Sequence, residues 1–229
     1  SNVYSFRSIF FTVIPIALAY DAISRERANK SLDILLSKPI SRTELVLGKF
    51  FGAFLTLVII IGVVHLFGYA VAIAFSGKIP TFFDLGGFGA YLGIILLGMA
   101  CYLGLALLFS VITRGTAASL IVTLILALFV LSIPYLIGIM YYAMNNPDVA
   151  GGLMVGGVDL GVPPWWLKAT YAIDPGSCMV VVYEVLPRVG PASTTPVMLT
   201  IWESILSMFI FVAVCLSLSL AIFQHKDLQ

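Results

Sequence analysis

Three long runs without a charged side chain limit what this chain can fold into. They cover residues 50–77, 85–113 and 115–147, and each exceeds the ~20 apolar residues that an α-helix needs to cross a bilayer. Only 10% of the residues are charged, whereas soluble domains carry about 25%. The sequence therefore predicts an all-α, polytopic helical membrane protein. We expect one transmembrane domain over residues 1–229, with no soluble domain attached.

Hydrophobic length and helix-start motifs divide the chain into five expected spans. We place them at about residues 3–20, 44–75, 87–112, 116–142 and 197–223. The second should begin with a capping box, in which the Ser41 hydroxyl and the Glu44 carboxylate accept hydrogen bonds from backbone N–H groups. It is longer than a bilayer requires, so its first two turns should lie in water. For the fifth span we expect Thr195 as the N-cap and Pro196 as the first helical residue.

Lysine and arginine are distributed unevenly between the two sets of loops that these spans create. Cytoplasmic loops are the ones enriched in these residues. The richer set holds Arg25, Arg27, Lys30, Lys38, Arg42, Lys49, Arg114 and Lys226, and the poorer set holds Arg7, Lys78, Lys168 and Arg188. We therefore expect a multi-pass protein of the cell membrane. Its C-terminus and its loop at residues 24–43 should be cytoplasmic, and its segment at residues 145–196 should lie outside.

The expected outer segment, between the fourth and fifth spans, is too apolar for a simple linker. Its first part is rich in Gly and Pro and should be irregular, with Trp165 and Trp166 in the lipid head-group belt. Asp174 as N-cap, Pro175 at the first helical position and Pro187 as the stop then predict a helix of about 12 residues. Because such a helix is too short to span, we expect it to be re-entrant or interfacial.

Charge is concentrated in one insert, residues 24–49. Of the chain's 12 Lys and Arg and 11 Asp and Glu, this insert holds Arg25, Glu26, Arg27, Lys30, Asp33, Lys38, Arg42, Glu44 and Lys49. Within it, Leu32, Leu35 and Leu36 have the i, i+3, i+4 spacing of one apolar helix face. Pro39 ends that helix, because the residue before a proline is pushed out of the helical region. The amphipathic helix would either lie on lipid head groups or dock in a groove of a cytoplasmic partner.

The order of features in this insert resembles a loop of the ABC-2-type permeases, the membrane subunits of ATP-binding-cassette exporters. In that family the loop joins the second and third spans. The matching features are the pair Glu26-Arg27, the leucines Leu32, Leu35 and Leu36, then Pro39, Ser41-Arg42, Glu44-Leu45 and Gly48-Lys49. The match is close over residues 23–55 and looser over the remaining spans. Residues 28–30 depart from it, since Ala, Asn and Lys stand where the family commonly has small Gly and Thr residues.

The resemblance implies an architecture and a set of partners. The insert would be the coupling helix, seated in a cleft of a separate ATPase subunit, with the coupling residues Glu26, Arg27, Leu32, Leu35, Leu36 and Pro39. A second copy or a sister permease would pair with this chain, and the translocation path would lie between them. The family usually has six spans with both termini inside. We therefore expect a further span upstream of Ser1.

The chain lacks a P-loop for ATP. Walker A needs a glycine five positions before its Gly-Lys pair and a Ser or Thr after it. Around Gly48-Lys49 those positions hold Thr43 and Phe50. The pair at residues 77–78 fails in the same way, with Ala before and Ile after. We therefore expect no enzyme activity and no cofactor in this chain, with ATP and Mg bound by the partner subunit. The net charge of +1 gives no indication of nucleic-acid binding.

Two ionisable residues lie within expected spans. His65 should lie in the outer half of its span, where we expect a hydrogen-bonded structural histidine rather than a proton relay. Glu203 should lie about 10 Å from the outer end of the fifth span. An acid inside the membrane is a functional candidate by default, so Glu203 is either an interfacial anchor or a residue on the translocation pathway.

Other functions remain as alternatives. An ion-coupled secondary transporter or channel would need paired ionisable residues near the midplane, or broken helices in matching repeats, and neither is visible. An intramembrane enzyme would need a motif such as HExxH, which is absent from the sequence. A membrane assembly or scaffold role also remains. Close helix approach is expected at the small-residue pairs Gly48/Gly52, Gly89/Gly93 and Ala100/Gly104, and the cysteines Cys101, Cys178 and Cys215 are expected as buried hydrophobic residues.

Overall fold

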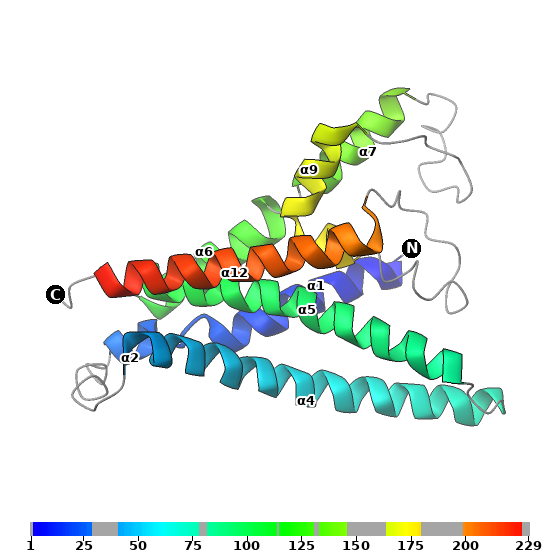
Figure 1. Ribbon diagram of the computed structural model, residues 1–229, viewed down its shortest axis with the longest axis horizontal. Coiled ribbons are helices and arrows are strands. Elements are labelled where there is room, and N and C mark those ends of the chain that lie inside the picture. The colour runs from blue at the N-terminus through cyan, green and yellow to red at the C-terminus, as the bar shows by residue number, and fades with distance from the viewer. Residues whose placement is uncertain are drawn as a thin grey trace.

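The chain folds into a bundle of long helices with a short helical arm (Figure 1). The computed structural model describes residues 2–28, 41–77, 82–113, 115–130, 133–145, 164–179 and 199–225. These residues form helices and no strand. The expectation of an all-α polytopic membrane protein is therefore confirmed.

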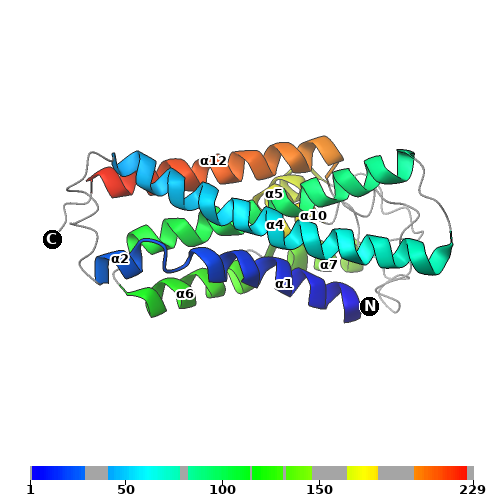
Figure 2. The ribbon, with the colours of Figure 1, turned by 90° about the horizontal axis from the view of Figure 1, so that it is seen from below.

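The elements follow one another in a simple order. They are α1 (Asn2–Ala19), α2 (Ser24–Ala28), α4 (Arg42–Ser76), α5 (Phe82–Ile112), α6 (Thr116–Ile125), the π-helix η1 (Leu126–Val130), α7 (Ile133–Asn145), α9 (Trp165–Ile173), α10 (Pro175–Met179) and α12 (Ile201–His225). In Figures 1 and 2, α1, α4, α5 and α12 run lengthwise through the bundle, whereas α7 and α9 form the arm. The start of α1 and the end of α12 lie at opposite ends of the bundle (Figure 1).

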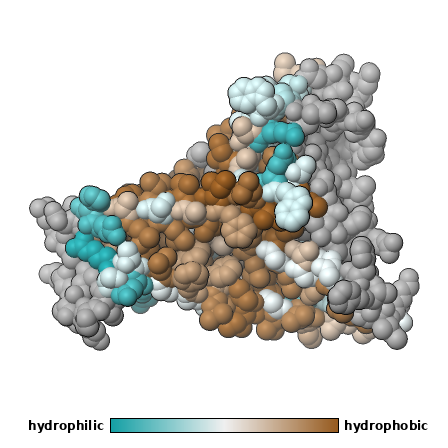
Figure 3. All heavy atoms as spheres, viewed as in Figure 1, coloured by the Kyte–Doolittle hydropathy of each residue, from teal (hydrophilic) through white to brown (hydrophobic). Residues whose placement is uncertain are grey.

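Helix α5 forms the core of the bundle. Within the described residues, three helices are long and apolar enough to cross a membrane: Arg42–Phe75, Leu85–Ile112 and Ile201–His225. In the most apolar stretch of α5, 72% of the residues are buried inside the protein, whereas in the corresponding stretches of α4 and α12 only 17% are buried. The outward faces of α4 and α12 are therefore apolar. Figure 3 shows this apolar surface over the middle of the molecule, with hydrophilic residues at the left end and near the arm.

Helix α4 has clear start and stop signals. At its start, the Ser41 N–H donates to Glu44 Oε2 over 2.7 Å and the Glu44 N–H donates to Ser41 Oγ over 3.2 Å, which confirms the expected capping box. At its end, Gly77 has φ 64° and donates its N–H to the Ile73 carbonyl over 3.0 Å. Only glycine adopts this left-handed conformation without steric cost. At about 1.5 Å per residue, the 35 residues of α4 span roughly 50 Å, well beyond the ~30 Å hydrocarbon core.

The region expected as the fourth span is not one regular α-helix. Helix α6 ends at Ile125, a π-helical turn covers Leu126–Val130, and α7 begins at Ile133. A π-turn inserts one extra residue per turn into an otherwise α-helical segment. The residues on both sides are equally apolar, so hydrophobic periodicity could not reveal the interruption.

The outer segment also differs from expectation in its first part. Trp165 and Trp166 open helix α9 instead of lying in irregular chain. Helix α12 is described from Ile201, with Thr200 as its cap, and the expected start at Thr195 and Pro196 lies outside the described residues. Thr200 and Glu203 form a second capping box: the Thr200 N–H donates to Glu203 Oε2 over 2.8 Å, and the Glu203 N–H donates to Thr200 Oγ1 over 3.4 Å.

Helices α9 and α10 are fastened to α12 by side-chain hydrogen bonds. Asp174 caps α10 as expected, accepting from the Gly176 N–H over 2.9 Å and from the Ser177 N–H over 3.0 Å. Ser207 of α12 donates to the carbonyl of Ala172 in α9. The expected stop at Pro187 lies outside the described residues.

Candidate functional site

Four parts of the chain that are distant in sequence meet at one end of the bundle. These are α2 with the turn before it, the start of α4, the last turns of α5 and the end of α12 (Figures 1 and 2). We call this end the charged end, and define it as residues 20–28, 41–49, 109–113 and 222–225. It contains the described parts of the charged insert, and we therefore take it as the candidate site.

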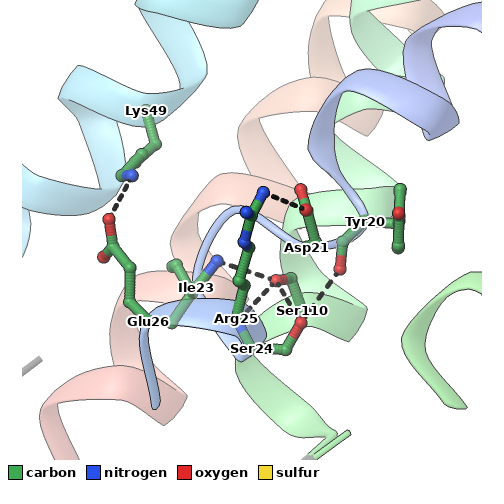
Figure 4. Close-up of polar contacts among 8 residues, drawn as sticks. All are labelled: Tyr20, Asp21, Ile23, Ser24, Arg25, Glu26, Lys49 and Ser110. Carbon is green, nitrogen blue, oxygen red and sulfur yellow. Dashed lines mark hydrogen bonds and ion pairs between the residues drawn. The ribbon is translucent and has the colours of Figure 1, made fainter. Parts of the chain in front are cut away.

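The hydroxyl of Ser110 fixes the beginning of α2. Ser110 Oγ accepts hydrogen bonds from the Ile23 N–H and from the Ser24 N–H, each over 3.0 Å (Figure 4). All three residues are fully buried. The Ser24 hydroxyl in turn donates to the Tyr20 carbonyl over 3.2 Å, which ties α2 back to the end of α1. The first N–H groups of a helix have no partner within the helix, and here a serine from another helix provides one.

An ion pair joins α2 to α4. Lys49 Nζ reaches the Glu26 carboxylate across the space between the two helices (Figure 4). The Glu26 side chain is only 18% exposed. Water and salt therefore screen this pair less than they would a fully solvated pair. A second pair, Arg25 with Asp21 at 3.6 Å, lies within one chain segment, and its arginine is 70% exposed.

Arg42 joins the start of α4 to the end of α12. Its Nη1 donates to the carbonyl of Phe223 over 3.0 Å and to that of Gln224 over 3.1 Å. Its guanidinium carbon also lies 5.9 Å from the centre of the Phe223 ring. The last carbonyl groups of a helix lack intrahelical partners and carry partial negative charge. The arginine therefore acts as a C-terminal cap that is provided by a different helix.

The structure describes only part of the predicted coupling set. Glu26 lies in α2 and pairs with Lys49, and Arg27 lies in the same helix. The remaining members fall outside the described residues: Leu32, Leu35, Leu36 and Pro39. Their role therefore stays a prediction.

Ser110 was not foreseen from the sequence. It is an isolated serine in a long apolar run, and nothing near it in the sequence indicates a partner 86 or 87 residues away. Lys49 was recognised as a charged residue of the insert, but its pairing with Glu26 depends on how α2 folds back against α4.

His65 lies in a cluster of aromatic rings. Its Nδ1 bonds the Ile61 carbonyl one turn earlier, over 2.9 Å, and a carbonyl can only accept, so Nδ1 carries the proton. The rings of Phe11 and Tyr91 have their centres 6.3 and 5.6 Å away. These contacts favour the structural histidine over the proton relay.

Glu203 lies in the first turn of α12, at the end of that candidate span. It is the third residue of the helix, exposed, and part of the Thr200 capping box. Its other carboxylate oxygen lies 3.9 Å from Lys168 Nζ on α9. Because the described helix begins at Ile201, the acid lies within one turn of its start, closer than the ~10 Å expected. Of the two roles left open, this position favours the interfacial anchor.

Asp174 is a buried acid that the sequence indicated only as a cap. It is 5% exposed and lies between α9 and α10, outside the three spanning helices. Burial raises the pKa of its carboxyl above the ordinary value, and the hydrogen bonds from Ser177 and Gly176 act in the opposite direction. Each of its described hydrogen bonds serves the start of α10.

Metal-ligating side chains do not gather in the described part of the chain. No group of three or more His, Cys, Asp or Glu residues there could hold a metal ion. The cysteines Cys101, Cys178 and Cys215 are buried and free, as expected.

Comparison with known proteins agrees with the resemblance seen in the charged insert. A sequence profile described as "ABC-2 family transporter protein" matches residues 4–228. The chain is also similar to the "Probable ABC transporter permease protein NosY" of Pseudomonas aeruginosa, with 34% identity over 110 residues. That alignment covers 46% of this chain and 38% of the relative's length. The profile match extends over nearly the whole sequence, and the chain therefore belongs to the ABC-2 family of transporter proteins.

Proposed function

We propose that this chain is the permease subunit of an ABC transporter and moves a substrate across the cell membrane with energy from ATP hydrolysed by a separate ATPase subunit. The family membership and the permease name of the relative support the membrane-subunit role. The sequence carries no Walker A motif, so the proposal assigns ATP and Mg to the partner. The expected export direction follows the family resemblance alone.

The observation that carries the proposal is how the charged end holds the insert. The chain enters the insert through α2, which is bonded to α5 by Ser110 and to α4 by Lys49. Farther along the insert, Ser41 directly caps α4. A force applied to residues 24–43 would therefore act on two membrane-crossing helices at once, as an ATPase-driven permease requires.

The alternatives gain less support from the described residues. A secondary transporter would depend on ionisable residues such as His65 and Glu203. His65 bonds the backbone of its own helix, and Glu203 belongs to a helix cap. The proposed partners are accordingly an ATPase subunit and a second copy or a sister permease. Lipid would cover the outward apolar faces of α4 and α12.

The test is co-purification of the full-length protein in mild detergent, with vanadate-sensitive ATPase activity measured in the eluate. The parent should capture an ATPase subunit. A Leu35→Asp, Leu36→Asp double variant should lose most of it, since charge on the apolar helix face opposes docking in a groove. Size-exclusion elution matching that of the parent would show that the variant is still folded.

A matched control places the same added charge at the opposite end of the molecule. Trp165 and Ile173 on α9 are 81% and 59% exposed and lie outside the three spanning helices. The Trp165→Asp, Ile173→Asp variant should retain the ATPase. If the parent captures no ATPase, or if both double variants lose it equally, the proposed coupling role fails.

A further inference from the structure

All the hydrogen-bonding positions of the Ser110 hydroxyl are used by Ser24 of α2 and by Ile23, the residue before it. It accepts from two consecutive backbone N–H groups, those of Ile23 and Ser24, and lies 3.4 Å from the Ser24 hydroxyl, to which it donates. A serine hydroxyl provides one donor and two acceptor sites. Figure 4 shows the three groups converging on this one oxygen from the turn and the first residue of α2.

This contact is stiffer than the Lys49–Glu26 pair, which also joins α2 to a spanning helix. Ser110 has a single side-chain torsion before its hydroxyl, it is fully buried, and its partners are backbone groups. The Lys49–Glu26 pair, by contrast, joins two long side chains, one of which is 37% exposed. Long side chains can change rotamer and absorb a displacement of α2, whereas a buried serine bonded to backbone cannot.

Ser110 also belongs to the helix best placed to pass movement on. Helix α5 is the most buried of the three spanning helices, and it packs against α1, α4, α6, α10 and α12. Closely packed interiors transmit strain with little compression. A displacement that reaches Ser110 therefore reaches the core of the bundle.

We propose that Ser110 is the positioning residue through which movement of the charged insert is passed to α5. The inference rests on the proposed function, because it needs an ATPase that moves the insert. It makes α5, rather than the adjoining helix α4, the first spanning helix to respond. The Lys49–Glu26 pair then holds α2 near α4 without determining the response.

The structure provides a matched control for a Ser110→Ala variant. Ser119 on the neighbouring helix α6 is equally buried, and its hydroxyl has no hydrogen-bond partner within the part of the chain that is described. Ser119→Ala therefore removes the same atom from the same kind of environment and breaks no described contact.

The first measurement is hydrogen–deuterium exchange of the full-length protein in detergent, with no ATPase present. In Ser110→Ala, the amides of Ile23 and Ser24 should exchange on the order of tenfold faster, because each loses its buried acceptor. In Ser119→Ala they should exchange as in the parent. Unchanged exchange in Ser110→Ala would overturn the proposal.

The second measurement follows α5 in the complex with the ATPase. A fluorescent label on Leu85→Cys reports from the far end of α5, where the native leucine is 49% exposed. Trapping nucleotide on the ATPase with vanadate should shift the label's spectrum in the parent and in Ser119→Ala. In Ser110→Ala the shift should be lost although the ATPase stays bound.

The outcomes separate the two proposals. A shift that persists in Ser110→Ala, or a label that never shifts in the parent, would overturn the role of Ser110 while an ATPase is still captured. If the parent captures no ATPase, the proposed function fails, and the transmission role fails with it. Exchange at Ile23 and Ser24 needs no partner, so it would still show whether the Ser110 contact itself exists.

Discussion

At the scale of single residues, the charged end is built by polar groups that satisfy the ends of helices other than their own. Ser110 serves the start of α2, and Arg42 serves the end of α12. Both work because a helix end leaves backbone groups without partners. Such contacts fix where one helix ends against the next, which apolar packing by itself does not specify.

Replacing Arg42 tests this at one residue. Arg42→Met keeps most of the apolar stem and removes the donors to Phe223 and Gln224. We expect the free energy of unfolding to fall by about 1–2 kcal/mol, since a charged donor to helix-end carbonyls is lost. Chemical denaturation in mixed micelles measures it.

Arg25→Met is the control for that change. Arg25 is 70% exposed and its ion pair is 3.6 Å long, and exposed pairs contribute little. Its free energy of unfolding should stay within about 0.5 kcal/mol of the parent. Equal losses in the two variants would show that net charge, and not the helix-end contact, matters.

At the scale of elements, the glycines of α5 differ in whether they face a neighbouring helix. A Cβ atom on Gly104 would lie 3.4 Å from the Cβ of Cys215 on α12, whereas one on Gly93 would meet nothing within 4 Å. Of the small-residue pairs singled out in the sequence, Gly48/Gly52 and Gly89/Gly93 likewise face open space. Only the pair that includes Gly104 therefore marks a close contact within this chain.

Two substitutions on α5 separate packing from helix propensity. Gly104→Leu should weaken the α5–α12 contact and lower the free energy of unfolding by about 1–3 kcal/mol, because a large side chain is forced into packed space. Gly93→Leu has the same change in composition and helix propensity but open surroundings. It should be at least as stable as the parent in detergent unfolding. A larger loss at Gly93 than at Gly104 would contradict the described packing.

The elements also show what the sequence could and could not predict. Long uncharged runs were enough to predict spanning helices, and the Ser41–Glu44 box was recognisable because its two residues are three positions apart. The Thr200–Glu203 box has the same spacing, but the Thr-Pro pair upstream is an equally good start signal in the sequence. The π-helical turn, helix α9 and Ser110 leave no local pattern, because uniformly apolar sequence does not show which face meets which neighbour.

At the scale of the whole molecule, the face in Figure 3 is hydrophilic at the charged end and towards the arm, and apolar between them. The uneven distribution of Lys and Arg predicts that the charged end faces the cytoplasm. The arm formed by α7 and α9 would then lie towards the outside. This orientation determines which side an ATPase could approach.

Labelling from each side of the membrane tests the orientation. Arg25→Cys places a thiol at the charged end, and Trp165→Cys places one on α9, both at exposed positions. A membrane-impermeant maleimide should label the α9 position in right-side-out vesicles and the α2 position only in inverted ones. The parent is the control, since its three thiols are buried. Labelling of both positions from one side, or in the reverse order, would contradict the orientation.

The contact of Arg42 with the last carbonyls of α12 also affects how this protein should be engineered. Helix α12 ends at His225, within two residues of the carbonyls that Arg42 holds. A tag or reporter joined to the end of α12 would therefore begin beside the start of α4. It would compete for space with whatever binds the charged insert. Capture experiments should carry their tag elsewhere, so that a missing partner is not an artefact of the fusion.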